Sequence, residues 1–348
     1  MLSHPHICGI GGIGTSGVAL LLRDLGIPVT GSDLRPSELT QMLNLRDVYI
    51  TYQPNPGLAT SASCVIVPAV FPQNHPEVEA ARAHSIPVVG RTEALAWICQ
   101  HYVENLTLVL GTQERASVAR AIAESEHCGY CTGMASRDGA PHAKFASNLV
   151  LDLDERGFYH HPELYKAFTN SRVLISDWAE KSFGYYPDDF SRDIFCANIR
   201  PYVRSVECLS SPHPWSSHAP QGIGWFECIA KGRYHEIRMH PVNVASALQK
   251  LRHLAHHAPV FAVMRPFIST IRHYDTAIWS QVLSLADRIC IISPPYEGCT
   301  HQECVEFVQK LCDSGCSVCV CTHSDAREAA GSESFSLWIG APDIISVL

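Results

Sequence analysis

The stretch that most constrains the fold is the glycine cluster near the start of the chain. A short apolar run, His6–Ile10, enters the cluster, and the mostly apolar residues 18–25 follow it. This pattern predicts a strand, a tight turn and a helix. Gly9, Gly11 and Gly14 have the G-x-G-x-x-G spacing, which lets the backbone approach a pyrophosphate at the N-terminus of a helix. We therefore predict a nucleotide-binding turn here.

An acidic residue follows the next predicted strand. That strand covers residues 27–31, and Asp33 stands two residues beyond it. In nucleotide-binding folds of this kind an acid at this place binds a ribose hydroxyl. The pattern indicates a nucleotide without identifying which one.

Strands and helices alternate along the chain, which predicts an α/β fold. Continuous apolar strands separated by helices are typical of parallel sheets covered on both faces. A chain of 348 residues is also too long for one ordinary core. We predict three α/β domains: an N-terminal Rossmann-like parallel sheet at 1–104, a reduced P-loop-type central domain at 105–255 and a small Rossmann-like C-terminal domain at 256–348.

The central domain opens with a strand at 106–110, and a loop at 111–117 leads into a predicted helix at 118–124. Strand, loop and helix are the context of a phosphate-binding loop, which requires glycines and a lysine followed by Ser or Thr. Here Glu114 brings a carboxylate toward the triphosphate, Arg115 stands in place of lysine, and Ala116 has no hydroxyl for magnesium. Two like charges about 4 Å apart repel by about 4 kcal/mol at an effective dielectric constant of 20. We therefore expect an impaired ATP site.

Candidate metal ligands are present, but we predict no metal site. The predicted strand at 149–155 ends in the acids Asp152, Asp154 and Glu155, which would suit magnesium. We favour an exposed strand end that carries charges. Cys128 and Cys131, and the cysteines between 312 and 321, lack a second pair at zinc-finger spacing. The fifteen cysteines are scattered through predicted strands and helices, so we expect reduced, buried thiols.

Composition excludes several classes of protein. Charged residues make up 17% of the chain and hydrophobic ones 46%, which indicates a globular rather than a disordered chain. A net charge of −8 argues against nucleic acid or an anionic membrane as the main partner. The apolar runs fall short of the ~20 residues of a membrane span, and the start of the chain lacks the pattern of a signal peptide. We expect a cytoplasmic protein.

Three separated motifs occur at the spacing of one known family. They are the glycine-rich stretch 9–17, Gly31-Ser32-Asp33, and Gly90-Arg91-Thr92-Glu93-Ala94-Leu95-Ala96. In these motifs and in the order of its three units, the chain resembles the Mur ligases. These ATP-dependent enzymes add amino acids to a UDP-linked muramyl precursor of peptidoglycan. Within the family, the resemblance is greatest to the ligases that join L-alanine to UDP-N-acetylmuramate.

The resemblance implies a UDP-sugar in the N-terminal domain in place of a nicotinamide cofactor. It implies that Asp33 faces the uridine end and that five residues face the pyrophosphate: Gly11, Gly12, Ile13, Gly14 and Ser16. Arg91, in the third motif, joins the predicted binding residues. The full predicted set is Gly9, Gly11, Gly12, Ile13, Gly14, Ser16, Asp33 and Arg91.

The resemblance weakens where the family performs catalysis. The family's phosphate-binding lysine falls on Arg115 and its magnesium-binding glutamate on Asp152. A C-terminal signature survives only as the Pro and Thr of residues 265–271. The chain is also shorter than a full ligase, mainly in its middle. No catalytic residue is therefore predicted beyond the degenerate positions Arg115 and Asp152, and binding of ATP with magnesium is doubtful.

Three hypotheses follow. The first is a non-catalytic or regulatory relative that binds a UDP-muramyl-type nucleotide sugar and docks on a genuine Mur ligase or on a second copy of itself. The second is a divergent but active ATP-dependent UDP-N-acetylmuramate–amino acid ligase that uses Arg115 and Asp152. The third is an NAD-dependent oxidoreductase built on the turn at 9–14 and Asp33. The third lacks a His, Tyr and Lys set for hydride transfer.

Overall fold

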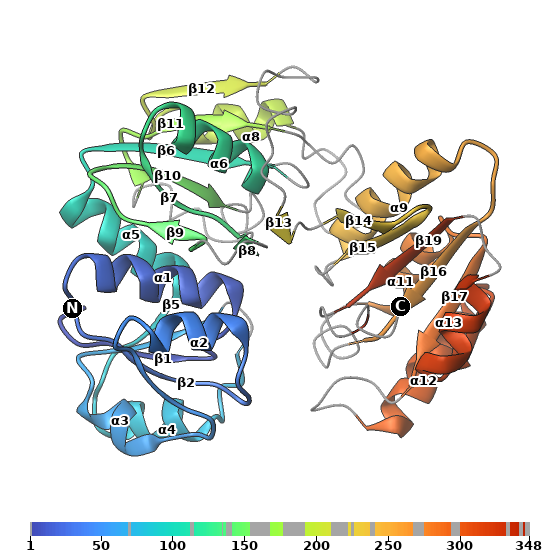
Figure 1. The fold of residues 1–348 in the computed structure, drawn as a ribbon, viewed down its shortest axis with the longest axis horizontal. Coiled ribbons are helices and arrows are strands. Elements are labelled where there is room, and N and C mark those ends of the chain that lie inside the picture. The colour runs from blue at the N-terminus through green and yellow to red at the C-terminus, as the bar shows by residue number, and fades with distance from the viewer. Residues whose placement is uncertain are drawn as a thin grey trace. The chain divides into compact units, whose positions relative to one another are not determined.

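The computed structural model describes residues 2–68, 71–111, 115–133, 135–136, 141–153, 168–176, 192–209, 222–223, 226–236, 241–266, 275–293, 300–331, 335–340 and 344. The chain divides into two compact units, which are drawn in Figure 1. The first unit comprises Met1–Asp177 and Arg192–Ile223, and the second comprises Trp178–Ser191 and Gly224–Leu348. The predicted α/β class is confirmed, with three main sheets that are mostly parallel.

The first unit begins with a five-stranded parallel sheet in the order β3-β2-β1-β4-β5. Its strands are β1 (His6–Cys8), β2 (Thr30–Ser32), β3 (Tyr49–Thr51), β4 (Val65–Val67) and β5 (Val88–Gly90). Its helices are α1 (Ile13–Asp24), α2 (Glu38–Asn44), α3 (Pro56–Ser61), α4 (Pro76–Ala83) and α5 (Arg91–Tyr102). The strand order reverses beside β1, and sheets of this kind bind ligands at the carboxyl ends of the strands at such a point. The glycine turn follows β1 there.

Local sequence explains where these helices begin. Ser37 forms a capping box with Thr40 at the start of α2, and Pro76 occupies the first turn of α4. The prediction missed α3, although the Asn55 side chain accepts a hydrogen bond from Leu58 N and is followed by proline. The helix predicted over 18–25 starts earlier, at Ile13, because Gly12 is extended and acts as its N-cap. The helix therefore rises directly from the glycine turn.

The first unit also contains a six-stranded sheet in the order β12-β11-β6-β10-β7-β9, in which only β9 is antiparallel. Its strands are β6 (Asn105–Leu110), β7 (Gly129–Cys131), β9 (Ala143–Lys144), β10 (Asn148–Leu153), β11 (Arg172–Ile175) and β12 (Ser205–Cys208). The helices are α6 (Arg115–Ser125) and α8 (Arg192–Ile199). Val118 and Ile122 of α6 pack on Val109 and Val150 in the core of this sheet. Helix α1 packs against β7 and β9, so it contacts both sheets of the unit (Figure 1).

A two-stranded antiparallel pair joins β8 (Ala135–Ser136) to β13 (Gly222–Ile223). The sequence predicts a loop over 210–224, so β13 differs from that prediction; residues 210–221 and 224 lie outside the described residues. Among the described residues, no helix is both long and apolar enough to cross a membrane.

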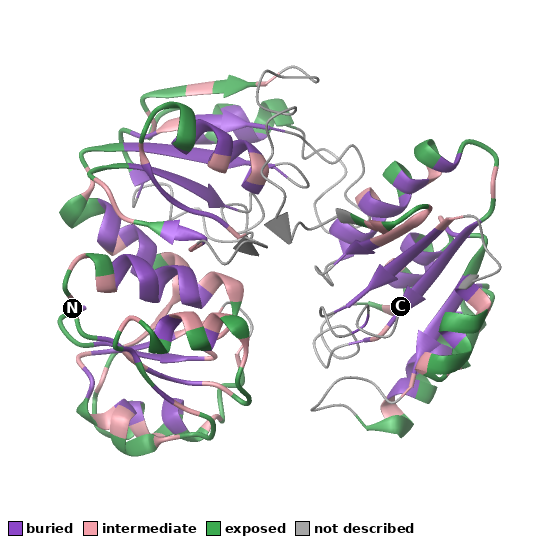
Figure 2. Ribbon diagram, viewed as in Figure 1, coloured by how far each residue is buried: buried purple, intermediate pink, exposed green. Residues whose placement is uncertain are grey.

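The second unit is a six-stranded sheet in the order β14-β15-β19-β16-β17-β18, parallel except for β14. Its strands are β14 (Phe226–Ala230), β15 (Arg233–Glu236), β16 (Val260–Met264), β17 (Arg288–Ile292), β18 (Val318–Cys321) and β19 (Phe335–Ile339). Its helices are α9 (Pro241–Ala255), α11 (Thr276–Leu283), α12 (His301–Asp313) and α13 (His323–Gly331). The buried strands and the exposed outer surface of α12 stand out in Figure 2.

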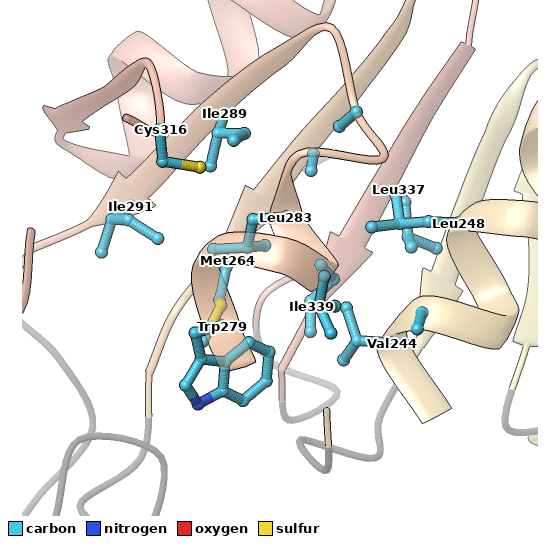
Figure 3. Packing of buried hydrophobic residues seen from close by; sticks show 14 of the residues in the cluster. Val244, Leu248, Met264, Trp279, Leu283, Ile289, Ile291, Cys316, Leu337 and Ile339 are labelled. Carbon is cyan, nitrogen blue, oxygen red and sulfur yellow. The ribbon is translucent and has the colours of Figure 1, made fainter. Parts of the chain in front are cut away.

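The core of the second unit explains why its start differs from the predicted boundary at 255/256. Val244 and Leu248 of α9 are fully buried against Leu337 and Ile339 of β19, and Trp279 fills the space beside Met264 (Figure 3). The apolar face of α9 is covered by this sheet. Helix α9 and the β14–β15 hairpin therefore fold with the C-terminal residues and not with 105–223.

One pair of cysteines differs from the expectation of reduced thiols. Cys290 of β17 and Cys321 of β18 are joined by a disulfide, with their Cα atoms 6.3 Å apart. The other cysteines in the described part of the chain are free, including the predicted metal candidates Cys128 and Cys131.

Candidate functional site

The first candidate site is the glycine turn between β1 and α1. Gly9 has φ +60°, a left-handed conformation that favours glycine. Its carbonyl accepts hydrogen bonds from Gly12 N at 3.1 Å and from Thr15 Oγ1 at 2.6 Å, which close the turn. Gly12 is exposed and provides α1 with no side-chain cap. The first amides of this helix, at Ile13 and Gly14, are therefore the groups that can bind an anion.

Asp33, which directly follows β2, stabilises this turn by hydrogen bonding. Its Oδ2 accepts a hydrogen bond from Gly11 N at 2.7 Å, and its Oδ1 accepts one from Leu34 N at 2.8 Å. A Cβ on Gly11 would lie 2.9 Å from Asp33 Oδ2 and 2.8 Å from Thr40 Cγ2. Contacts within the protein therefore already require glycine at this position. Contact of Asp33 with a ribose or uridine stays a prediction.

Arg91 provides the cationic group closest to this turn among the predicted binding residues. It is the first residue of α5, and its Nε donates to the Gly14 carbonyl at 3.2 Å. A Cβ on Gly14 would lie 2.8 Å from that Nε, so the arginine side chain occupies the space beside Gly14. The structure thus brings Gly9, Gly11, Gly12, Ile13, Gly14, Asp33 and Arg91 together around one helix start.

Ser16 differs from its predicted role. Its side chain is fully buried, and its hydroxyl donates to Gly12 O at 2.7 Å and lies 3.1 Å from His142 Nε2. His142 precedes β9 of the second sheet and also contacts the Ile13 carbonyl at 3.0 Å. Ser16 therefore joins the turn to the neighbouring sheet, and its hydroxyl is enclosed rather than exposed to a ligand.

The buried contact between His142 and α1 predicts that the stability of the first unit depends on pH. Burial lowers the pKa of His142 to about 4, despite the hydrogen bond to Ile13 that opposes the shift. In the unfolded chain the His142 imidazole has a pKa near 6.5 and therefore binds a proton more readily. The stability that depends on the neutral imidazole is fully present above pH 6.5 and is lost as the pH falls toward 4. Between pH 7 and 5 we expect the free energy of unfolding of the first unit to fall by about 2 kcal/mol on this account. Urea unfolding at both pH values measures this loss, and His142→Gln should remove most of it; an equal loss in that variant would contradict the assignment.

The second candidate site is the loop after β6. Residues 112–114, including the predicted carboxylate of Glu114, lie outside the described residues. Arg115 is the first residue of α6; its Nη1 donates to the Gly111 carbonyl at 2.7 Å, and its Nε lies 3.5 Å from Asp152 Oδ2. The side chains of Arg115 and Asp152 are only 8% and 2% exposed. The two degenerate positions therefore form a buried ion pair.

The burial of Asp152 overturns the interpretation of 149–155 as an ordinary strand with charges at an exposed end. Asp152 lies opposite Val109 in the pairing of β10 with β6, and its Oδ1 accepts a hydrogen bond from Gly133 N at 2.8 Å. The two parallel strands end side by side, so the acid reaches the helix start that follows β6. Asp154 and Glu155 are not among the described residues.

Sequence reasoning missed His142 because no local motif marks it. The residue is 126 positions from Ser16, and only the folding of β9 against α1 brings them together. The ion pair between Arg115 and Asp152 was also not predicted, although both residues were candidate positions. A base just after one strand and an acid at the end of the adjacent parallel strand lie at the same edge of the sheet. Such a pattern can therefore predict a contact between them.

Comparisons with known proteins agree with this geometry. Residues 4–103 match the family described as "Mur ligase family, catalytic domain". The UDP-N-acetylmuramate-alanine ligase MurC of Thermotoga maritima has a similar fold, with a TM-score of 0.63 and 15% identity over 99% of this chain and 96% of that one. The murein peptide ligase Mpl of Psychrobacter arcticus gives a TM-score of 0.64 and 12% identity over 99% and 98% of the two chains. Residues 4–103 therefore match the Mur ligase family, and the chain shares its fold with the MurC and Mpl ligases along its length.

Proposed function

We propose that this chain binds a UDP-muramyl-type nucleotide sugar at the glycine turn and no longer uses ATP, acting as a non-catalytic or regulatory relative in peptidoglycan metabolism. The proposed partners are that nucleotide sugar and a genuine Mur ligase or a second copy of this chain. The similar solved structures are those of a UDP-N-acetylmuramate-alanine ligase and a murein peptide ligase, which supports the choice of ligand class.

The turn supports the nucleotide-sugar part of the proposal. The uncapped start of α1 favours negative charge because its amide groups and the helix dipole both attract anions. Arg91 adds a permanent positive charge within hydrogen-bond distance of the same turn. A diphosphate is the group that this combination suits.

The single observation that carries the non-catalytic part is the buried pair of Arg115 and Asp152. A phosphate-binding loop must direct its cation toward the triphosphate and its acid toward magnesium. Here the guanidinium is bound to the Gly111 carbonyl and lies beside the acid. Nucleotide binding would have to separate two charges that already neutralise each other in a site of low dielectric constant.

The same pair also supports a second candidate, the divergent active ligase. Arg115 and Asp152 lie at the ends of adjacent strands, β6 and β10, and keep the charges that a phosphate-binding cation and a metal-binding acid would have. If the pair opens when Mg-ATP arrives, both groups become available for catalysis.

Calorimetric titration of the full chain distinguishes these functions. The panel is UDP-N-acetylmuramate, UDP-N-acetylglucosamine, Mg-ATP and NAD. We expect binding of UDP-N-acetylmuramate and no heat from Mg-ATP at micromolar concentrations. Micromolar binding of Mg-ATP with release of phosphate in the presence of UDP-N-acetylmuramate and L-alanine would establish the active ligase instead. Selective binding of NAD would indicate the oxidoreductase.

Arg91 provides a site-specific test of the proposed ligand position. Arg91→Met removes the positive charge and keeps a long apolar stem beside Gly14. Charge-assisted hydrogen bonds contribute about 1.5–3 kcal/mol, so we expect affinity for UDP-N-acetylmuramate to fall roughly 10- to 100-fold. Arg82→Met is the matched control, because that side chain lies on the surface of α4 and bonds to Gln73. Equal affinity of the two variants would place the ligand elsewhere.

A further inference from the structure

A cluster of three potential metal ligands lies within the first sheet, apart from the glycine turn. His6 and Cys8 are two residues apart on β1 and therefore project to the same face. Glu77 of α4 reaches the same place from the covering helix. One ligand atom from each residue lies within 4.8 Å of the other two, and all three residues are buried. No local sequence motif marks this cluster.

The spacing within the cluster is close to that of a tetrahedral metal site. Glu77 Oε1 lies 3.1 Å from His6 Nε2, and Glu77 Oε2 lies 3.1 Å from Cys8 Sγ. Zinc bond lengths of about 2.0–2.3 Å place tetrahedral ligand atoms roughly 3.3–3.7 Å apart. The two contacts of the Glu77 carboxylate are therefore within a few tenths of an ångström of the spacing in such a site.

Neighbouring groups already orient these ligands. Thr30 Oγ1 lies 2.9 Å from His6 Nδ1, so Nδ1 can donate its proton to Thr30 once a metal replaces the hydrogen bond between Nε2 and Glu77. Ser32 Oγ donates to Glu77 Oε2 at 2.6 Å, and Asn55 N donates to Oε1 at 2.7 Å. Such outer hydrogen bonds fix the tautomer and the orientation of metal ligands.

His75 lies at the edge of this cluster. Its Nδ1 is 3.6 Å from Glu77 Oε2, is buried, and has no hydrogen-bond partner among the described residues. It is not one of the three residues whose ligand atoms all lie within 4.8 Å of one another. The side chain is 19% exposed, so the edge of the cluster reaches solvent.

We propose that His6, Cys8 and Glu77 form a site for a zinc-like divalent cation, with the fourth position left to solvent. One neutral imidazole, one carboxylate and one thiolate balance the two positive charges of the ion, as a buried site requires. On binding, the Cys8 thiol proton is released to solvent and a bond from Sγ to the metal forms. The alternative is a purely hydrogen-bonded network without metal affinity.

Cobalt titration of the chelator-treated full chain tests the site, because thiolate-bound Co²⁺ shows an intense charge-transfer absorption. The cysteines that are exposed in the described part of the chain are first replaced with serine to remove adventitious ligands; they are Cys208, Cys228, Cys312 and Cys319. We expect one Co²⁺ per chain with this absorption, displaced by Zn²⁺. Cys8→Val should abolish the absorption and weaken binding by more than ~100-fold, and Thr30→Val should weaken it about 10- to 100-fold.

Cys64→Val is the matched control, because Cys64 is a buried thiol beside the same sheet but outside the cluster. It should leave the stoichiometry and absorption unchanged. The proposal is overturned if the folded protein, checked by circular dichroism, takes up no cobalt with a thiolate band. It is equally overturned if Cys8→Val or Thr30→Val binds as tightly as the unmodified chain. Neither result depends on whether the glycine turn binds a nucleotide sugar.

Discussion

Asp152→Ala is expected to lower the free energy of unfolding of the first unit by about 3–5 kcal/mol. The substitution leaves the Arg115 guanidinium buried without its counter-charge, and it removes the acceptor for Gly133 N. Breaking a buried pair from one side is more destabilising than losing the pair itself, because the remaining charge is buried without a counter-charge. Urea denaturation followed by circular dichroism measures the change.

Two further variants show whether the buried charge is the cause. The double variant Arg115→Met, Asp152→Leu removes both charges and should recover most of the lost stability. Glu124→Ala breaks the pair of Arg120 and Glu124 in the same unit and should cost less than about 1 kcal/mol, because the Glu124 side chain is 51% exposed. If Asp152→Ala is as mild as Glu124→Ala, the pair does not close this site and the main support for lost ATP binding is removed.

Glu77→Leu, measured in chelator-treated protein, should destabilise the first unit by about 3 kcal/mol or more. Burial alone would raise the pKa of Glu77, but hydrogen bonds from His6, Ser32, the Asn55 amide and Cys8 lower it to about 2, so the carboxylate is ionised at neutral pH. Leucine leaves these donors buried without an acceptor. Each unsatisfied group costs about 1–3 kcal/mol, which exceeds the gain from an apolar side chain.

Glu79→Leu is the matched control, since Glu79 lies on the exposed side of the same helix, α4. We expect a change within about 0.5 kcal/mol there. Comparable losses in the two variants would mean that leucine disturbs α4 itself and that the buried network contributes little.

The regular parts of the fold could be predicted because local signals agree with the tertiary structure. Apolar runs such as 106–110 and 260–264 are strands in the structure, since both faces of these sheets are covered. The boundary of the last unit could not be predicted in this way. The amphipathic pattern of α9 requires some apolar partner, but only the folded chain shows that β19 provides it.

The candidate sites also combine residues that local sequence predicts with residues that only the fold brings together. The glycine turn was predictable because close backbone approach requires glycine at Gly9 and Gly11 whatever else surrounds them. The neighbours that complete the turn come from distant segments: Arg91 is 77 residues from Gly14, and His142 is 126 residues from Ser16. The burial of Asp152 was mispredicted because an acid at the end of a strand is more often solvated than paired.

The dual contact of α1 has a practical consequence for truncated proteins. Gly17 approaches the second sheet so closely that a Cβ there would lie 2.8 Å from Cys131 Sγ, and Asp24 Oδ2 accepts a hydrogen bond from Phe145 N at 2.9 Å. A fragment ending at residue 104 would lack these neighbours, and the apolar side of α1 would be exposed. A fragment intended for ligand titration or crystallisation therefore has to include the second sheet as well.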